Sequence, residues 1–484
     1  MPVVIKDLFI KDEVLGASMM TQYDQVDIGP VPPEPDEIRD TGISTNSLLR
    51  LLLKAMYVRG LELATQLSED LKLNRAIVRE LLDEGRERKL VQTLGMDGSG
   101  LHSEIRYGLT GEGQSWASEA LEQSLYIGPA PVSLETYHEQ VARQRLMGER
   151  VDEANLSGGL DHLVIPPSLI RRLGQAVNSS RPMLLYGSPG NGKTTVAEVM
   201  GTLFSDTIYI PYCIEVDQQI IKVFDPTLHV PVPDYQATNG ASNGGRRYVP
   251  DPRWVPCRRP VVKTAGELTL EMLDLRYNPH SRFYEAPLHV KAIGGTFLID
   301  DLGRQLLQPE ELLNRWIGPM EKRVDYLTLN TGRTFEVPFD ELLIFSTNLT
   351  PEDLMDPAFL RRIGYKIEMI KPTPEHFREV FQRLCDKYGI PYEENVVNFA
   401  MEKIQNDLGQ PLAFYQPQFL VDQVLASCKY EQVPPRLTTE LVIDAMDNMT
   451  AKEVDREPQG ASTAAYESPP ERSAAPGRPG FFDH

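Results

Sequence analysis

The stretch GSPGNGKTT, residues 187–195, decides the fold of this chain of 484 residues. It has the spacing G-x-x-x-x-G-K-[ST], follows the apolar run PMLLY at 182–186, and precedes a helix-forming run at 195–203. Glycines in such a turn leave backbone N–H groups pointing at phosphate oxygens, and the start of the following helix favours negative charge. We therefore expect a loop that binds a nucleoside triphosphate, formed by Gly187, Pro189, Gly190, Asn191, Gly192, Lys193, Thr194 and Thr195.

Two side chains of this loop have distinct expected roles. Lys193 places a positive charge near the β and γ phosphates, and the hydroxyl of Thr194 can bind Mg²⁺. The alternative, an ordinary glycine-rich turn, is disfavoured by the strand before the loop and the helix after it. A phosphate loop alone does not distinguish a kinase, a GTPase, a helicase or a molecular motor.

A second apolar run, GTFLIDD at 295–301, ends in two carboxylates. A strand buried on both faces reads as a continuous apolar run, and acids at its end lie where open α/β sheets bind ligands. We expect Asp300 to hold the Mg²⁺ shell and Asp301 to polarise the attacking water. The alternative is that both acids begin a surface loop.

A third apolar run, ELLIFST at 341–347, is followed by Asn348, whose amide can orient water or contact the γ-phosphate. A short helix starting at Asp356-Pro357 then ends at Arg361 and Arg362. A guanidinium in this place suits the γ-phosphate of a neighbouring subunit. Surface ion pairs are the competing interpretation of the two arginines.

Together these motifs resemble the AAA+ ATPase superfamily, over residues 160–449. The resemblance implies an α/β fold with a parallel P-loop sheet at 160–372 and a helical lid at 373–450, and it implies ATP and Mg²⁺ as ligands. It also implies the following assignments: a Walker A motif at 187–194, a Walker B motif at 297–301, sensor 1 at Asn348, an arginine finger at Arg361 or Arg362, and sensor 2 at Arg436.

The chain departs from this superfamily in two ways. The second Walker B acid is usually glutamate and is aspartate here, so hydrolysis is expected, with ATP binding as a switch as the alternative. Lys193 and Asp300 are 107 positions apart, more than a compact connection needs, which predicts an insertion at about 212–292. An insertion there resembles the MoxR-like, helix-2-insert branch of the superfamily.

The predicted insertion contains a basic segment. Residues 240–263 hold six basic residues against one acid, a local charge of +5, with Tyr248 and Trp254 among them. Basic and aromatic side chains together suit a nucleic-acid backbone or a substrate in a ring channel. In a chain of net charge −20, pairing with acidic groups of the same protein is the main alternative.

Residues 45–125 predict a separate domain. Three helices, a hairpin at 90–109 and a closing helix after Thr110 resemble the winged-helix family, whose third helix would enter the DNA major groove. The domain has ten basic and twelve acidic residues, unlike the basic footprint of a strong DNA binder. DNA binding and protein–protein contact therefore remain equal alternatives.

The remaining segments and the composition complete the prediction. We expect a disordered arm at 1–44, a linker at 126–159 and a disordered tail at 451–484, and on position alone Leu163, Val164 and Ile165 are candidates for the adenine pocket. No apolar run reaches the length of a membrane span, and four scattered cysteines give no metal or disulfide pattern, so a cytoplasmic protein without membrane contact is expected.

These features predict an ATP hydrolase that remodels a macromolecular partner as a homo-oligomer, with a hexameric ring as the first expectation. The partner would be a protein client or DNA, bound through the winged helix and the basic insertion. Two alternatives are a DNA-bound regulator that uses ATP as a conformational switch, and a small-molecule kinase or GTPase. The latter is disfavoured because the chain has no N-K-x-D tetrapeptide that reads guanine.

Overall fold

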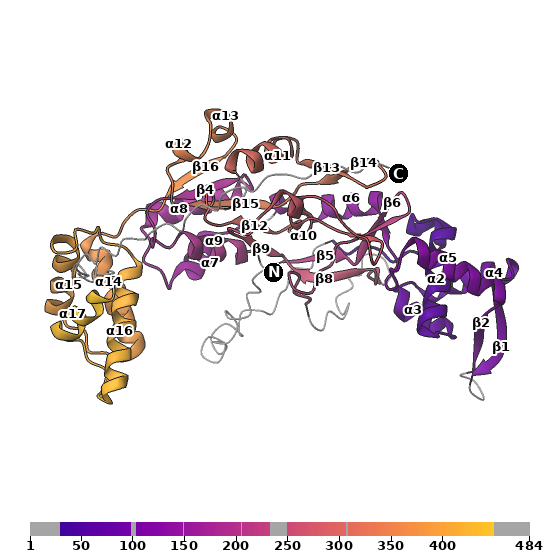
Figure 1. The fold of residues 1–484 in the computed structure, drawn as a ribbon, viewed down its shortest axis with the longest axis horizontal. Helices are drawn as coiled ribbons and strands as arrows, with labels where there is room; N and C mark the ends of the chain where they lie inside the picture. Colours follow the sequence, from indigo (N-terminus) through magenta and orange to yellow (C-terminus); the bar gives the residue numbers. More distant parts are fainter. Residues whose placement is uncertain are drawn as a thin grey trace, which may run out of the picture.

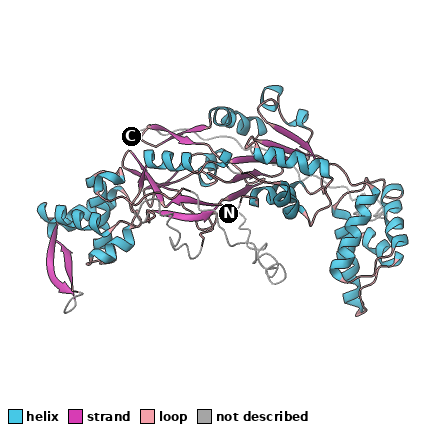
Figure 2. Cartoon of the chain, turned by 180° about the vertical axis from the view of Figure 1, so that it is seen from behind, coloured by secondary structure: helices cyan, strands magenta, loops and turns pink. Residues whose placement is uncertain are grey.

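The structure is a computed structural model that describes residues 30–97, 103–148, 150–204, 206–232, 249–305 and 308–449. Figure 1 shows an α/β body in the middle, with one mainly helical unit at each end. The N-terminal unit contains α2 to α5, and the C-terminal unit contains α14 to α17. Figure 2 shows the same arrangement from behind. No helix in the described ranges is long and apolar enough to cross a membrane.

The body is organised around a sheet of five strands in which every neighbouring pair is parallel. In spatial order these strands are β16 (Tyr365–Glu368), β4 (Met183–Tyr186), β15 (Leu342–Thr347), β12 (Thr296–Ile299) and β9 (Val261–Thr264). The apolar runs predicted as buried strands are therefore β4, β12 and β15. The predicted α/β fold with a parallel P-loop sheet and a helical lid is confirmed.

Side chains of the central strands alternate between two cores. Met183 and Leu185 of β4 pack into one core, whereas Leu184 between them packs into the other. The first core is covered by α7 (Glu153–Leu160), α8 (Pro167–Asn178) and α9 (Lys193–Thr202). The second is covered mainly by α11 (Pro309–Lys322), which contributes the fully buried Trp316. Cover on both faces explains why these strands have no polar alternation.

A second sheet of five strands extends the body toward the N-terminal unit. Its spatial order is β10 (Arg276–Asn278), β11 (Phe283–Glu285), β7 (Gln219–Lys222), β6 (Cys213–Val216) and β3 (Val132–Ser133). It shares a core with the pair β5 (Thr207–Pro211) and β8 (Trp254–Arg258) and with the hairpin β13 (Val324–Thr328) and β14 (Thr334–Pro338). Strand β9 of the central sheet lies within the predicted insertion at 212–292, so the extra elements are not one continuous insertion.

Two segments predicted without structure are packed into the body. The predicted linker at 126–159 forms β3, α6 (Leu134–Arg143) and most of α7, with Val132 and Tyr137 fully buried. In the predicted N-terminal arm, residues 38–41 form a short 3₁₀ helix, and Ile38 and Ile43 are buried. The predictions of a disordered arm and of a linker were wrong for these residues, because their few apolar side chains are buried against distant segments of the chain. Residues 1–29 and the predicted tail at 451–484 lie outside the described residues.

Within the described part of the basic segment, three of its six basic residues form ion pairs: Arg253, Arg259 and Lys263. Arg253 and Asp251 form a salt bridge of 2.8 Å with both side chains 2% exposed. Arg259 donates to both carboxylate oxygens of Asp206 at 2.5 Å, also in the interior. Arg258 is exposed, and Arg246 and Arg247 lie outside the described residues. Pairing with acidic groups of the same protein is therefore confirmed for Arg253 and Arg259, and binding of nucleic acid through these two side chains is wrong.

The N-terminal unit has the element order expected of the segment 45–125. Its elements are α2 (Thr45–Arg59), α3 (Ala64–Leu71), α4 (Arg75–Glu87), β1 (Val91–Asp97), β2 (Glu104–Leu109) and α5 (Gly111–Gln123). Side-chain caps start three of these helices, from Ser44, Asn74 and Thr110. The unit shares its core with Tyr126, Ala130 and Cys213 at the edge of the second sheet. Its assignment as a winged helix stays a prediction.

The C-terminal unit consists of four helices around one apolar core. They are α14 (Pro374–Tyr388), α15 (Glu394–Asn406), α16 (Tyr415–Glu431) and α17 (Thr439–Asp447). The residue that begins α16 lies against the phosphate loop, because the backbone N–H of Tyr415 donates to the carbonyl of Gly190 at 3.1 Å. The predicted lid therefore contacts the predicted nucleotide site.

Candidate nucleotide site

The phosphate loop connects β4 to α9 and has the backbone geometry that its glycines permit. Gly187, Gly190 and Gly192 have φ values of 137°, 76° and 76°. A Cβ on Gly187 would lie 2.7 Å from the carbonyl oxygen of Met369, and one on Gly190 would overlap the ring of Tyr415. A side chain at either position would thus meet both strain and a clash. The loop leads directly into the N-terminus of α9, as anion binding requires.

The order of the strands brings the three predicted motifs together. Parallel strands end at the same edge of a sheet, and β15 lies between β4 and β12. Asn348, which follows β15, therefore lies between the phosphate loop after β4 and the acids after β12. Its amide oxygen accepts a hydrogen bond from the Lys193 ammonium at 2.7 Å, and its amide nitrogen donates to Asp301 at 3.0 Å.

Lys193 is almost completely buried within this network. Besides Asn348, its ammonium donates to the carbonyls of Gly187 and Ser188, each at 2.9 Å. Burial lowers the pKa of Lys193, and the carboxylates of Asp301 and Asp300 oppose that shift. A phosphate group would supply the strong charged partner that carbonyl oxygens do not.

Asp300 and Thr194 form the part of the site suited to Mg²⁺. The Thr194 hydroxyl donates to the two carboxylate oxygens of Asp300 at 3.1 and 2.9 Å. Hydroxyl and carboxylate oxygens are hard ligands of the kind that Mg²⁺ prefers, so the two residues fit this ion. Lys263 lies 3.5 Å from Asp300 and 2.7 Å from Glu198. Burial works against its charge, but the two carboxylates outweigh that effect and raise the pKa of Lys263.

The backbone of Asp301 adopts a conformation that is uncommon for residues other than glycine. Its φ is 51°, in the left-handed region where aspartate and asparagine are several-fold enriched over other non-glycine residues. This geometry gives a physical reason for aspartate at this position. The carboxylate accepts a hydrogen bond from the Asn348 amide at 3.0 Å.

A small cavity of about 100 Å³ lies beside the phosphate loop, on the side of the lid. Leu163, Val164 and Ile165, the candidates for an adenine pocket, line it together with Gly192 and Phe414. Asn191 also lines it, is 2% exposed, and has no hydrogen-bond partner for either amide atom among the described residues. A planar base with polar edges would satisfy this amide. The apolar lining and the buried amide thus fit a nucleobase.

The predicted arginines are not gathered at this network. Arg361 follows α13 (Pro357–Leu360) and is exposed, and the Nε of Arg362 donates to Glu321 at 2.6 Å. Arg436 is exposed in the segment between α16 and α17, where its carbonyl lies 3.9 Å from the Cys428 sulfur. Cys428 is about 20 Å along α16 from Tyr415 at the phosphate loop. The structure does not place Arg436 at the nucleotide site of its own chain.

Sequence reasoning missed three contributors to the site. Tyr415 and Phe414 begin the lid helix at the phosphate loop, but no motif marks them. Lys263 is part of the basic segment, and it reaches Asp300 because β9 lies beside β12 in the sheet. The strand pairing carries this information, and the local sequence does not.

Comparisons with known proteins are distant. A family described as "Domain of unknown function (DUF8689)" matches residues 373–448, the C-terminal helical unit. No curated protein matches the chain by sequence. Among solved structures, a RuvB variant from Thermotoga maritima is 16% identical, over 61% of this chain and 73% of that chain, with a TM-score of 0.33.

Two further solved structures are similar at the same level. Domain III of the replication initiation protein DnaA from Thermotoga maritima is 12% identical over 60% of this chain and 95% of that chain, with a TM-score of 0.34. NtrX from Brucella abortus is 13% identical over 59% of this chain and 56% of that chain, with a TM-score of 0.35. Similarity at this level assigns no activity. The fold class follows from the parallel strand order and the phosphate loop.

Proposed function

We propose that this protein is an ATP hydrolase of AAA+ type that uses Mg²⁺ and remodels a macromolecular partner as a homo-oligomer. The observation that carries the proposal is the bridge made by Asn348. Its amide joins Lys193 of the phosphate loop to Asp301 of the acidic pair, at 2.7 and 3.0 Å. A phosphate-binding cation and a water-polarising carboxylate are thus connected through the neutral amide between them.

Each residue has a role that follows from its chemistry. Lys193 and the backbone N–H groups of the loop bind the phosphates, and Thr194 and Asp300 would hold Mg²⁺. The metal ion would neutralise charge on the phosphate oxygens. Asp301 accepts a proton from the attacking water, and Asn348 orients that water. Asn191 and the apolar lining of the neighbouring cavity hold the base.

The arginines after α13 are proposed to act on ATP bound to a neighbouring subunit. Arg361 is exposed on its own chain and is therefore available to a second copy. Arg362 forms a salt bridge with Glu321 on its own chain. It is therefore either a residue that positions Arg361 or the second candidate for the arginine that acts on the neighbouring ATP. An arginine acting in trans makes hydrolysis depend on assembly, which is why we propose a ring, with a hexamer as the first expectation.

The N-terminal unit is the proposed contact for the partner. Its third helix, α4, carries exposed Arg75 and Arg79, whereas Arg86 and Arg88 pair with Asp83 and Glu84. Internal pairing leaves little unbalanced positive charge on this helix. A protein client is therefore favoured over tight DNA binding, and DNA remains a partner to test.

Steady-state ATP turnover by the full chain tests the proposal. We expect Mg²⁺-dependent turnover that Lys193→Ala abolishes and that Asp301→Asn reduces by about 10²- to 10⁴-fold. Lys371→Ala, which removes an exposed lysine outside the network, is the matched control and should keep wild-type turnover. Light scattering at micromolar concentration, with ATP and Mg²⁺, should show an oligomer. Turnover unaffected by Asp301→Asn would contradict the role of that residue, and a strict monomer would contradict the ring.

A nucleotide switch with little hydrolysis is the second candidate. The observation that favours it is the short Asp301 side chain, whose carboxylate is already engaged by Asn348. Tight ATP binding by the wild type without turnover, at any oligomer size, would support this candidate in place of the first. Measuring ATP binding and ATP turnover with and without double-stranded DNA tests whether the partner is nucleic acid.

A further inference from the structure

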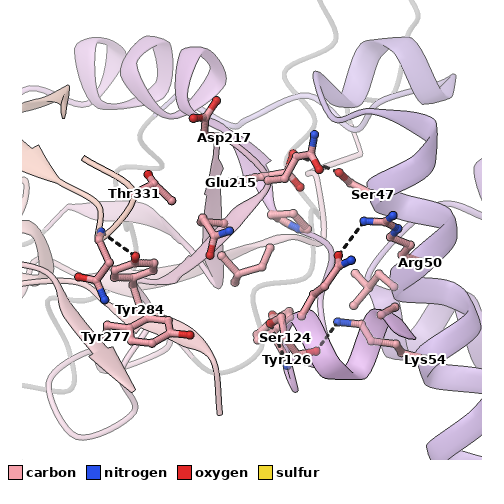
Figure 3. Close-up of a pocket in the computed structure, with 18 residues that line it drawn as sticks. Ser47, Arg50, Lys54, Ser124, Tyr126, Glu215, Asp217, Tyr277, Tyr284 and Thr331 are labelled. Atoms are coloured by element: carbon pink, nitrogen blue, oxygen red, sulfur yellow. Dashed lines mark hydrogen bonds between the residues drawn. The ribbon is translucent and has the colours of Figure 1, made fainter. Parts of the chain in front are cut away.

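A second cavity lies far from the phosphate loop, at the junction of the N-terminal unit and the second sheet. Its volume is about 500 Å³, within the range of sites that bind small molecules. Figure 3 shows α2 and the end of α5 on one side, and the β6–β7 hairpin with Tyr277 and Tyr284 on the other. Two separate parts of the fold therefore contribute to one pocket.

One wall of this cavity carries two positive charges. Arg50 and Lys54 are four residues apart on α2 and so lie on the same face of the helix. Arg50 donates to the side chain of Gln123 at 2.8 Å, and Lys54 donates to the carbonyl of Ser124 at 3.0 Å. In the part of the chain that the structure describes, neither is in a salt bridge.

Lys54 is the more informative of the two. It is 5% exposed, and lysine is almost never buried to this extent unless it is paired with an acid. Burial, and then the nearby charge of Arg50, lowers the pKa of Lys54 to about 8. An anion between Arg50 and Lys54 would give Lys54 the negative partner that it lacks. The same anion would offset the repulsion between the two positive side chains.

The opposite wall offers contacts of a different kind. Tyr277 and Tyr284 have ring centroids 5.0 Å apart, and Tyr277 is 36% exposed. The hydroxyl of Tyr284 accepts a hydrogen bond from the backbone of Asn330, which fixes the pair. Glu215 lies between the two walls, beside α2, where the Ser47 hydroxyl donates to its carboxylate at 3.4 Å. It is half-buried, and burial raises its pKa more than the Ser47 hydroxyl lowers it. The opposite wall thus presents an aromatic face, and Glu215 next to α2 presents a carboxyl group that can bond to an N–H or O–H donor.

We propose that this cavity binds a small aromatic phosphate of mononucleotide size. The phosphate would lie between Arg50 and Lys54, the ring would pack against Tyr277, and a donor on the ligand would bond to Glu215. An inorganic anion would leave most of the 500 Å³ unfilled, which favours an organic ligand. The site is independent of the ATP site. Because the cavity spans the junction, its ligand would stabilise the contact between the N-terminal unit and the body.

Titration calorimetry on the full chain carrying Lys193→Ala tests the proposal, since that substitution weakens binding of phosphates at the ATP site. The probes are AMP, GMP, CMP and UMP, with inorganic phosphate alongside. At least one nucleotide should bind about tenfold more tightly than inorganic phosphate, a difference of one decade in affinity. No binding by any nucleotide, or equal affinity for inorganic phosphate, would overturn the proposal.

Matched variants locate the binding. Lys54→Gln and, as a second variant with a half-buried side chain, Arg50→Gln should each weaken nucleotide binding by about tenfold or more. Arg79→Gln removes an exposed charge from α4 and should leave the affinity unchanged. Equal affinity in wild-type and Arg50→Gln proteins would place the ligand elsewhere, and circular dichroism shows whether each variant is folded.

Discussion

Arg253 ties three segments of the chain together, and its replacement by methionine tests how much that junction contributes to stability. Its guanidinium donates to both carboxylate oxygens of Asp251 and to the carbonyl of Pro131 at 2.9 Å, and it lies 3.4 Å from the carbonyl of Thr41. Thr41 leads into α2, and Pro131 precedes β3. The pair therefore holds the start of the N-terminal unit and the second sheet against β8.

The magnitude follows from burial. Both members of the pair are 2% exposed, so Arg253→Met leaves the Asp251 carboxylate without a counter-charge in the interior. Breaking such a pair costs about 3–5 kcal/mol. At about 1.4 kcal/mol per factor of ten, local opening should become roughly one hundred to a few thousand times more frequent. The Asp251 carboxylate keeps one donor, the backbone N–H of residue 253, which favours the lower half of the range.

Hydrogen exchange read by mass spectrometry measures this opening. Peptides from β5 and β8 should exchange faster in Arg253→Met by the factor given above. Arg258→Met, an exposed position in the same strand, is the control and should change stability by less than about 0.5 kcal/mol. Adding Asp251→Asn removes the stranded charge and should recover much of the loss. Exchange in Arg253→Met that matches the Arg258→Met control would refute the reasoning.

Three further predictions concern single side chains. Asp301→Glu should lower ATP turnover by roughly a few-fold, because glutamate lacks the preference of aspartate for a φ of 51° and its longer side chain moves the carboxylate relative to Asn348. Equal or faster turnover in a phosphate-release assay contradicts this. Asn191→Leu should reduce the preference for ATP over GTP by about tenfold, because the amide of Asn191 can pair with the donor and acceptor of adenine. Competition binding of ATP and GTP measures this preference, and an unchanged preference would contradict a role of Asn191 in base recognition. Burial alone would raise the pKa of Asp325, but the hydrogen bonds and charges of His289 and Arg315 outweigh burial and lower this pKa to about 2. The stability from this carboxylate should thus be complete above pH ~4 and lost as pH falls toward ~2, and Asp325→Asn should flatten that part of a denaturation series.

The buried ion pairs of the basic segment bear out pairing within the protein, and they show why charge counting could not locate the partners. A local charge of +5 in sequence suggests an exposed face, because arginine is mostly found at surfaces. Asp251 is two residues from Arg253, whereas Asp206, the partner of Arg259, is 53 residues away. The second pair forms because β5 and β8 lie side by side, and no local pattern reveals that pairing.

The sequence by itself determined the fold class and the centre of the candidate site. The glycine spacing at 187–192 permits one loop geometry, and apolar runs ending in Asp300, Asp301 and Asn348 indicate strands with their polar groups at one edge. These signals are local, so they can be read without knowing which strands pair.

Tertiary structure decided what depends on contacts between distant segments. It placed Asn348 between Lys193 and Asp301, brought Lys263 to Asp300, and left Arg436 away from the phosphate loop. It also formed the cavity between α2 and the second sheet, whose lining residues range from Ser47 to Thr331 in the chain. The physical reason is that strand order and helix docking are set by the burial of apolar surface over the whole chain. A residue's sequence neighbours specify its conformation far better than they specify its partners.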